Sequence, residues 1–152
     1  MKRVIEGLDQ LQGLAGQEIG LSDWVEVPQA TIDAFAETTG DRQWIHVDRE
    51  RAAAESPFGA TIAHGFLTLS LLSHLKSQAV EVRGVRMGIN YGLNRVRFPA
   101  PVRSGSRLRG RFTLQSVEPI DGGLQAVVAA TVEIDGSQKP ALAAEWVLRY
   151  YR

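Results

Sequence analysis

An aspartate and a histidine five residues apart, Asp41 and His46, are the side chains of this sequence best suited to acid–base chemistry. A carboxylate beside an imidazole can orient the ring and hold a water molecule, and the neutral ring can take a proton from that water. A spacing of five does not align two side chains on one helix face. We therefore expect an irregular turn, helped by Gly40 and Trp44, to bring them together. Spacing alone also allows a plain surface aspartate and a partly buried loop histidine.

A histidine–glycine pair, His64-Gly65, follows in the string TIAHGFLTLS. We expect a buried helix over 64–78 to begin at this pair. Helix N-termini expose unpaired N–H groups and the positive end of the dipole, and glycine lets a ligand approach the backbone. Gly65 is thus a predicted oxyanion-hole donor for a polarised carbonyl, or simply a flexible helix start. For His64 we expect a structural role, capping or anchoring the helix start, with a second catalytic base as the alternative.

The helix over 64–78 carries a polar stripe on an otherwise apolar surface, formed by Ser70, Ser73 and Ser77. No Gly-x-Ser-x-Gly elbow surrounds these serines. We interpret them as satisfying backbone groups or holding a catalytic side chain, rather than as nucleophiles. His74 lies within the leucine-rich run, where we expect a packed or partly exposed ring.

Two other classes of ligand site have weak signals. The three histidines lack recognisable zinc spacing, and no glycine loop suited to phosphate is present. Arg95 and Arg97, in the stretch NYGLNRVRFPAPV, have the chemistry to meet phosphates of a nucleotide-bearing substrate. For any single one of these arginines we favour the interpretation as a solvated strand residue.

The order of elements predicts the fold class. The run over 64–78 is apolar nearly all round, so we expect it to be enclosed on most sides. The other elements predicted from periodicity and turn signals are helices over 4–13, 30–40 and 48–56, and strands over 18–27, 86–98, 106–118, 124–135 and 141–151. Helices followed by antiparallel strands indicate a single α+β domain, residues 1–152, whose sheet curls around the enclosed helix. Such a half-wrap leaves apolar surface and a sheet edge exposed, so we expect a homodimer.

Composition excludes several partners. Lysine plus arginine and aspartate plus glutamate number 17 each, so no overall field favours nucleic acid or an anionic membrane. The absence of cysteine excludes disulfides, thiolate nucleophiles and cysteine-ligated zinc, and is compatible with the cytoplasm. The longest mostly apolar run, 65–75, is shorter than the roughly 20 residues that span a bilayer. We expect a cytoplasmic protein with no nucleic-acid partner, no membrane insertion and no metal.

Three segments together resemble the MaoC-like dehydratase family, which includes the R-specific (type 2) enoyl-CoA hydratases. GDRQWIH keeps Gly40, Asp41 and His46 of that family's motif, and replaces its Asn-Pro pair with Gln43-Trp44, which is typical of a subgroup that resembles NodN proteins. AHGFLTLSLLS is similar to the family's central helix, and NYGLNRVRFPAPV to the strand that follows it. The resemblance covers the chain from about residue 20.

This resemblance implies a hotdog fold, an antiparallel sheet wrapped around a long central helix, and a dimer. It implies hydration of trans-2-enoyl-CoA to (R)-3-hydroxyacyl-CoA, with an acyl-CoA thioester as substrate and no cofactor. Asp41 and His46 would activate water, the Gly65 N–H would hold the thioester oxygen, and Ser73 falls where some relatives have a helper serine. Since one fold can host several reactions, an acyl-CoA thioesterase and a non-catalytic acyl-binding module stay open.

Overall fold

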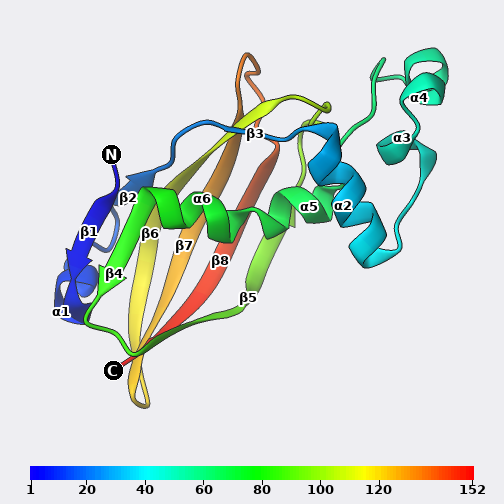
Figure 1. Ribbon diagram of the computed structural model, residues 1–152. Coiled ribbons are helices and arrows are strands. Elements are labelled where there is room, and N and C mark those ends of the chain that lie inside the picture. The colour runs from blue at the N-terminus through cyan, green and yellow to red at the C-terminus, as the bar shows by residue number, and fades with distance from the viewer.

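The computed structural model, which describes residues 1–152, is a curved antiparallel sheet with helices lying across one face (Figure 1). The strands are β1 (Arg3–Glu6), β2 (Glu18–Leu21), β3 (Val25–Glu26), β4 (Val80–Arg83), β5 (Met87–Arg97), β6 (Arg107–Ile120), β7 (Gly123–Ile134) and β8 (Leu142–Tyr151). The helices are α1 (Gly7–Gln12), α2 (Gln29–Thr39), α3 (Trp44–Val47), α4 (Arg49–Glu55), α5 (Gly65–Ser70) and α6 (Leu72–Ala79). The α+β class and the hotdog arrangement predicted from the sequence are confirmed.

The four long strands of the main sheet come from the second half of the chain, as predicted, and two short strands from the first half join them. The strand order of this sheet is β2-β6-β7-β8-β5, with β3 also paired to β6, and all of these pairings are antiparallel. Every second residue of β7 is buried, which places one face of the sheet against the helices. The four predicted strands of this half match β5, β6, β7 and β8, with each end within two residues.

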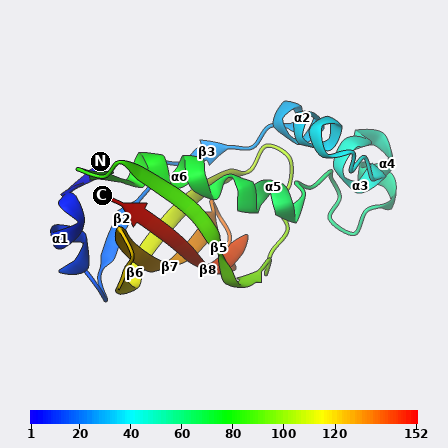
Figure 2. The same ribbon diagram turned by 90° about the horizontal axis from the view of Figure 1, so that it is seen from below.

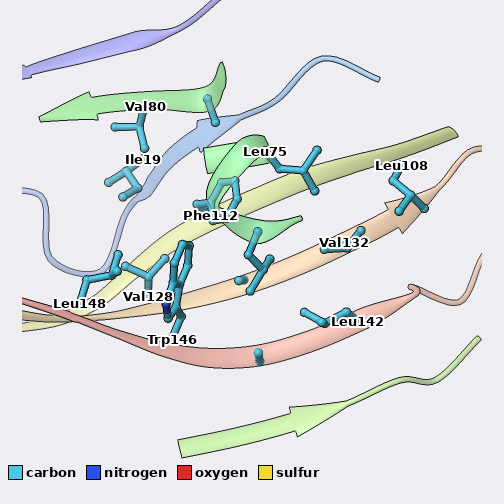
Figure 3. Packing of buried hydrophobic residues seen from close by; sticks show 14 of the residues in the cluster. Ile19, Leu75, Val80, Leu108, Phe112, Val128, Val132, Leu142, Trp146 and Leu148 are labelled. Carbon is cyan, nitrogen blue, oxygen red and sulfur yellow. The ribbon is translucent and has the colours of Figure 1, made fainter. Parts of the chain in front are cut away.

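The predicted central helix is two helices, α5 and α6, broken at Leu71. The Leu71 N–H still donates to the Leu67 carbonyl, and the Leu75 N–H to the Leu71 carbonyl, so the two helices follow one another across the sheet (Figure 2). Leu75 of α6 and Phe112 of β6 are both buried in the core between helix and sheet (Figure 3). Gly110 makes room for Leu75, because a Cβ there would lie 3.0 Å from the Leu75 Cβ.

The expectation that this helix is enclosed on most sides is wrong for a single chain. Leu72, Leu75 and Ala79 are buried against the sheet, but the Phe66 side chain is 70% exposed. Strand β5 forms one edge of the sheet, and nearly all its residues are exposed. The helix is therefore covered on its sheet side and open on the opposite side.

The N-terminal segment differs from the sequence prediction. Its first residues form β1, which pairs in parallel with the unpredicted strand β4, and only α1 is helical. This pairing buries Ile5 of β1 and Val80 of β4. A helix over 4–13 could not pair with β4 in this way. The strand predicted over 18–27 is two short strands, β2 and β3, each paired with β6. No helix in the structure combines the length and the apolar character needed to cross a membrane.

Candidate active site

Helices α2, α3 and α4 gather at one end of the α5–α6 axis, beyond the sheet (Figures 1 and 2). Gly40 ends α2 in the left-handed conformation, with φ at 79°, and its N–H donates to the Ala36 carbonyl. This turn sends the chain back past α2 and so places Asp41 at the start of the returning segment. Trp44 begins the short helix α3, so the irregular turn expected there is a single helical turn that carries His46 on its buried side.

Asp41, His46 and His64 form one cluster. The side-chain oxygen or nitrogen atoms that they contribute lie within 4.8 Å of one another. The two imidazole rings stack, with centroids 3.8 Å apart and planes at 22°. Both histidines are buried, whereas Asp41 is exposed. The convergence of Asp41 and His46 expected from the sequence is thus present, with His64 as a third member.

The backbone fixes the protonation of both rings. His46 Nδ1 lies 2.7 Å from the Ile62 carbonyl oxygen, and His64 Nε2 lies 2.9 Å from the Asp41 carbonyl oxygen. A carbonyl oxygen only accepts, so each of these nitrogens carries the proton. In the neutral ring the other nitrogen then has a free lone pair. His46 consequently presents Nε2 as a base.

His64 anchors the Asp41 loop to the start of α5. Its side chain makes no capping hydrogen bond to α5, so the capping role expected from the sequence is wrong and the anchoring role is correct. The ring is held between His46 and Phe35, whose centroid lies 4.9 Å from that of His64. His64 Nδ1 is buried and has no hydrogen-bond partner. Since this ring bonds the Asp41 backbone and is enclosed by two other rings, we interpret His64 as a positioning residue.

The same cluster is the one group of side chains suited by type to a metal. A metal ion bound by two histidines must lie near the plane of each ring, where the lone pairs point. Here the rings are stacked in nearly parallel planes, so the lone pairs of His46 and His64 run side by side instead of meeting. This geometry favours acid–base chemistry over chelation.

A buried glutamine that the sequence analysis missed supports His46. The Gln29 amide nitrogen donates to the His46 carbonyl at 2.7 Å and to Asp33 at 2.8 Å, and its oxygen accepts from the Thr61 hydroxyl. It thereby joins the start of α2 to α3 and to the strand-like segment before α5. The signal was available: Gln29 shares the three-to-four spacing of Ile32 and Ala36, which marks a polar side chain on the buried face.

Gly65 is the first residue of α5, and no acceptor within the chain takes its N–H. It lines an apolar cavity of about 260 Å³. The Phe98 ring closes over it, since a Cβ at Gly65 would lie 3.2 Å from that ring. Asp41 and His46 are not among the residues that line this cavity; the link between them and Gly65 is His64, which precedes Gly65 and bonds the Asp41 backbone.

The structure does not bring Ser73 to this cluster. Ser73 is exposed on α6, eight residues after Gly65, which corresponds to about 12 Å along a helix axis. It lines two adjoining hollows between α6 and the β5–β8 edge of the sheet, together with Asn90 and Trp146. Ser70 donates to the Phe66 carbonyl, as expected for a serine that satisfies backbone.

The remaining candidates lie on the surface. His74 is exposed on α6. Arg95 is exposed on β5, and Arg97 donates to its neighbour's carbonyl, at Val96. Both arginines fit the solvated-strand interpretation.

Sequence comparison places the chain in a family. Residues 10–137 match the model of the MaoC-like domain. The chain is 54% identical over 149 residues to 3-hydroxyacyl-thioester dehydratase Z of Mycobacterium tuberculosis, covering 97% of this chain and 98% of that protein. It is 54% identical over 135 residues to nodulation protein N of Rhizobium leguminosarum bv. viciae, covering 87% and 83%. The chain belongs to the MaoC-like dehydratase family, and as such it is an enzyme of the hydro-lyase class.

The fold agrees with this assignment. The unliganded R-hydratase of Pseudomonas aeruginosa superposes with a TM-score of 0.73 at 24% identity, covering 91% of this chain and 82% of that one. At this identity the match speaks for the hotdog fold alone.

The burial of His46 predicts how stability depends on pH. Burial lowers the pKa of His46 below its ordinary 6.5, although the hydrogen bond to Ile62 opposes this. The folded state thus binds this proton less readily than the unfolded state. The free energy of unfolding should therefore be largest above pH 6.5 and decrease as the pH falls from 6.5 toward the folded-state pKa.

Two measurements check this. An NMR titration of the His46 ring should give a midpoint below 6.5, and urea unfolding of His46→Gln should lose part of the decrease in stability below pH 6.5. A His46 midpoint above 6.5, with a stability profile that the substitution leaves unchanged, would contradict the buried, neutral assignment.

Proposed function

We propose that residues 1–152 act as one MaoC-like hotdog domain that reversibly hydrates trans-2-enoyl-CoA to (R)-3-hydroxyacyl-CoA. The carrying observation is that the Asp41 carboxylate lies close to His46, whose Nδ1 proton is held by Ile62, and that His64 ties the Asp41 loop to the residue before the free N–H of Gly65. The dehydratase relatives support the reaction class. The R stereochemistry and the CoA carrier come from the family resemblance.

Hydration needs a base and an acid at two neighbouring carbons. The exposed Asp41 carboxylate accepts a hydrogen bond from the attacking water. His46 Nε2 takes a proton from this water as the water oxygen attacks C3. The His46 Nδ1–H remains on the Ile62 carbonyl throughout, which holds the ring in place. The proton is then returned to C2, so the product has gained one water and nothing else.

The attack on C3 moves negative charge to the thioester oxygen. A backbone N–H at a helix start, such as that of Gly65, stabilises this charge better than it stabilises the neutral carbonyl. One such donor contributes about 3 to 4 kcal/mol to lowering a barrier. The mostly apolar lining of the cavity beside Gly65 lowers the local polarity around that bond and so strengthens it.

A thioesterase and a non-catalytic acyl-binding module are the alternatives, and the His46 geometry argues against the binding module. A binding module has no need for a ring whose proton is fixed on one nitrogen so that the other is a base. Hydrolysis would release free thiol from a saturated acyl-CoA, which hydration does not do. A thiol-release assay alongside the hydration assay distinguishes the two reactions.

We infer further that the enzyme is a homodimer that uses the β5 edge. Large exposed apolar side chains gather on β5, the segment after it and α5: Phe66, Met87, Ile89, Tyr91, Leu93 and Phe98. An apolar, unpaired edge strand is a liability in a monomer. Pairing with a second copy would cover both the edge and the open side of α5.

The first prediction concerns the acid–base pair. Asp41→Asn and His46→Ala should each lower kcat/KM for crotonyl-CoA by about 10² to 10⁴, because each removes a proton-transfer group. The absorbance of the enoyl thioester measures this. The exposed controls Asp121→Asn and His74→Gln should retain wild-type rates. Full turnover in both Asp41→Asn and His46→Ala would end the assignment.

The second prediction isolates the Gly65 N–H. Gly65→Pro removes this donor at the first helical position, where proline is tolerated, and His64 already has the extended backbone (ψ 139°) that precedes proline. Gly65→Ala brings the same Cβ against Phe98 but keeps the N–H. We expect Gly65→Pro to be about 10² to 10³ slower in kcat than Gly65→Ala. Equal rates in the two variants would show that this amide is not the oxyanion donor.

The third prediction concerns assembly. In sedimentation analysis the wild-type chain, of 16.7 kDa, should behave as a dimer. Leu93→Lys should shift it to the monomer, since a lysine on an edge strand opposes pairing. Gln138→Lys, with the same change of charge in an exposed turn, should leave the dimer intact. A wild-type monomer at micromolar concentration would be inconsistent with the proposed interface.

A further inference from the structure

A hollow between α6 and the β5–β8 edge of the sheet is lined by hydrogen-bond donors that lack acceptors. Its volume is about 180 Å³, and its polar side chains are Ser73, Lys76, Asn90 and Tyr150. It lies away from the Asp41–His46 cluster. Lys76 is eleven residues beyond Gly65, which corresponds to about 16 Å along a helix axis.

The central charge of this hollow has no counter-ion. No carboxylate lies within salt-bridge distance of the Lys76 ammonium, which sits over the Tyr150 ring, 5.7 Å from its centroid. The nearby carboxylate of Glu81 is already paired with Lys2 and Arg83. Burial is the sole cause that lowers the pKa of Lys76, in keeping with a cation that has no partner in the chain.

The other polar groups of the hollow are donors as well. The Trp146 indole N–H donates to Asn90 Oδ1 at 2.7 Å, and an indole nitrogen can only donate. The Asn90 amide NH₂ is therefore left as a donor. Burial raises the pKa of Tyr150 to about 12, so its hydroxyl keeps its proton at neutral pH. Neither the Tyr150 nor the Ser73 hydroxyl has a hydrogen-bond partner within the chain.

We propose that this hollow is an oxyanion-binding site, in which Lys76, Asn90, Tyr150 and Ser73 together hold a carboxylate or phosphate group. The only charged side chain of this site is an unpaired ammonium, and the amide and the two hydroxyls around it can each donate a hydrogen bond, so the site is complementary to an anionic group. Lys76 is partly buried and Tyr150 is buried beside Trp146 and Leu148, which strengthens the bonds that these two groups make.

The position of the site indicates which anionic group it would bind, and this step rests on the proposed function. With the thioester oxygen at Gly65, an anionic group some 16 Å away along the helix belongs to one of two parts of the substrate. It is either a carboxylate at the remote end of the acyl chain or a phosphate of the thioester carrier. Both present the same oxyanion chemistry to Lys76.

The site itself is tested without turnover. Glutarate and inorganic phosphate serve as probes, titrated into the purified chain by calorimetry and by NMR. We expect Lys76→Gln to weaken binding of the preferred probe by about tenfold or more, because a hydrogen bond to a charged group is lost. Lys76→Arg should retain binding, and Tyr150→Phe should weaken it to a smaller extent.

Lys139→Gln is the matched control, since it removes the same charge from an exposed turn and should leave binding unchanged. Thermal unfolding checks that each variant is folded. Absence of binding of either probe to the wild-type chain, or equal binding by wild type and Lys76→Gln, would overturn the proposal. So would a Lys76→Gln variant that changes only the dimer equilibrium, because Lys76 would then serve the subunit interface.

Kinetic measurements identify the source of the anion. Three substrates are compared: a methyl-ended enoyl-CoA, its analogue with a terminal carboxylate, and the methyl-ended enoyl-pantetheine thioester without phosphate. A raised KM in Lys76→Gln for the carboxylate analogue alone assigns the site to the acyl chain. A raised KM for both CoA substrates, and not for the pantetheine thioester, assigns it to the carrier phosphate.

An unchanged KM for all three thioesters would refute the assignment to substrate. A wild-type chain that turns over none of them would defeat the hydratase proposal instead, while the anion titrations would still decide whether the site exists. The two failures are thus distinguishable.

Discussion

One hydrogen bond holds the candidate active site together: the bond from His64 Nε2 to the carbonyl oxygen of Asp41, at 2.9 Å. His64 is also the residue immediately before Gly65. The bond therefore joins the loop that carries the carboxylate to the residue that starts the core helix. His46 stacks on the same ring at 3.8 Å, so all three chemical groups take their positions from one buried imidazole. A neutral His64 can do this without proton transfer of its own, which explains why it need not be a second base.

Several neighbouring elements fix the positions of the groups around this bond. Gly40 in its left-handed conformation turns the chain after α2, and Gln29 at the start of α2 ties down the backbone of His46. The long strands position α5 and α6 through apolar packing, in which Leu75 and Phe112 are both fully buried (Figure 3). The same pair of helices thus connects two polar regions, an acid–base cluster at the start of α5 and a donor-lined hollow beside Lys76 on α6. This separation suits a long substrate that lies along the helix.

The sequence predicted what depends on local patterns. The four long strands, the helix ending at Gly40 and the helix over 48–56 all have strong periodic or turn signals, and all are found, the last as α4. Pairings between distant segments were not predictable in this way. The parallel pairing of β1 with β4 joins residues about 77 positions apart, and tertiary packing there overrides helix propensity. The break at Leu71 likewise has no glycine or proline to announce it.

The chemistry of the site was predictable to a similar degree. Asp41, His46 and Gly65 could be chosen from residue type and spacing, but the tautomer of His46 depends on Ile62, sixteen residues away, and only the folded chain shows it. Ser73 was placed in the site by resemblance, and in the single chain it faces the Lys76 hollow instead. The prediction that the central helix is enclosed failed for a single chain, because an apolar surface can be covered by a second subunit as well as by its own chain.

The central claim is that Asp41, His46 and the Gly65 amide act on one substrate molecule. A crystal structure of the Asp41→Asn variant with crotonyl-CoA tests it most directly. The account predicts the thioester oxygen about 2.7 to 3.1 Å from the Gly65 nitrogen, with C3 on the side of His46 Nε2. A thioester bound with its oxygen turned away from Gly65, or with C3 out of reach of His46, would contradict the account.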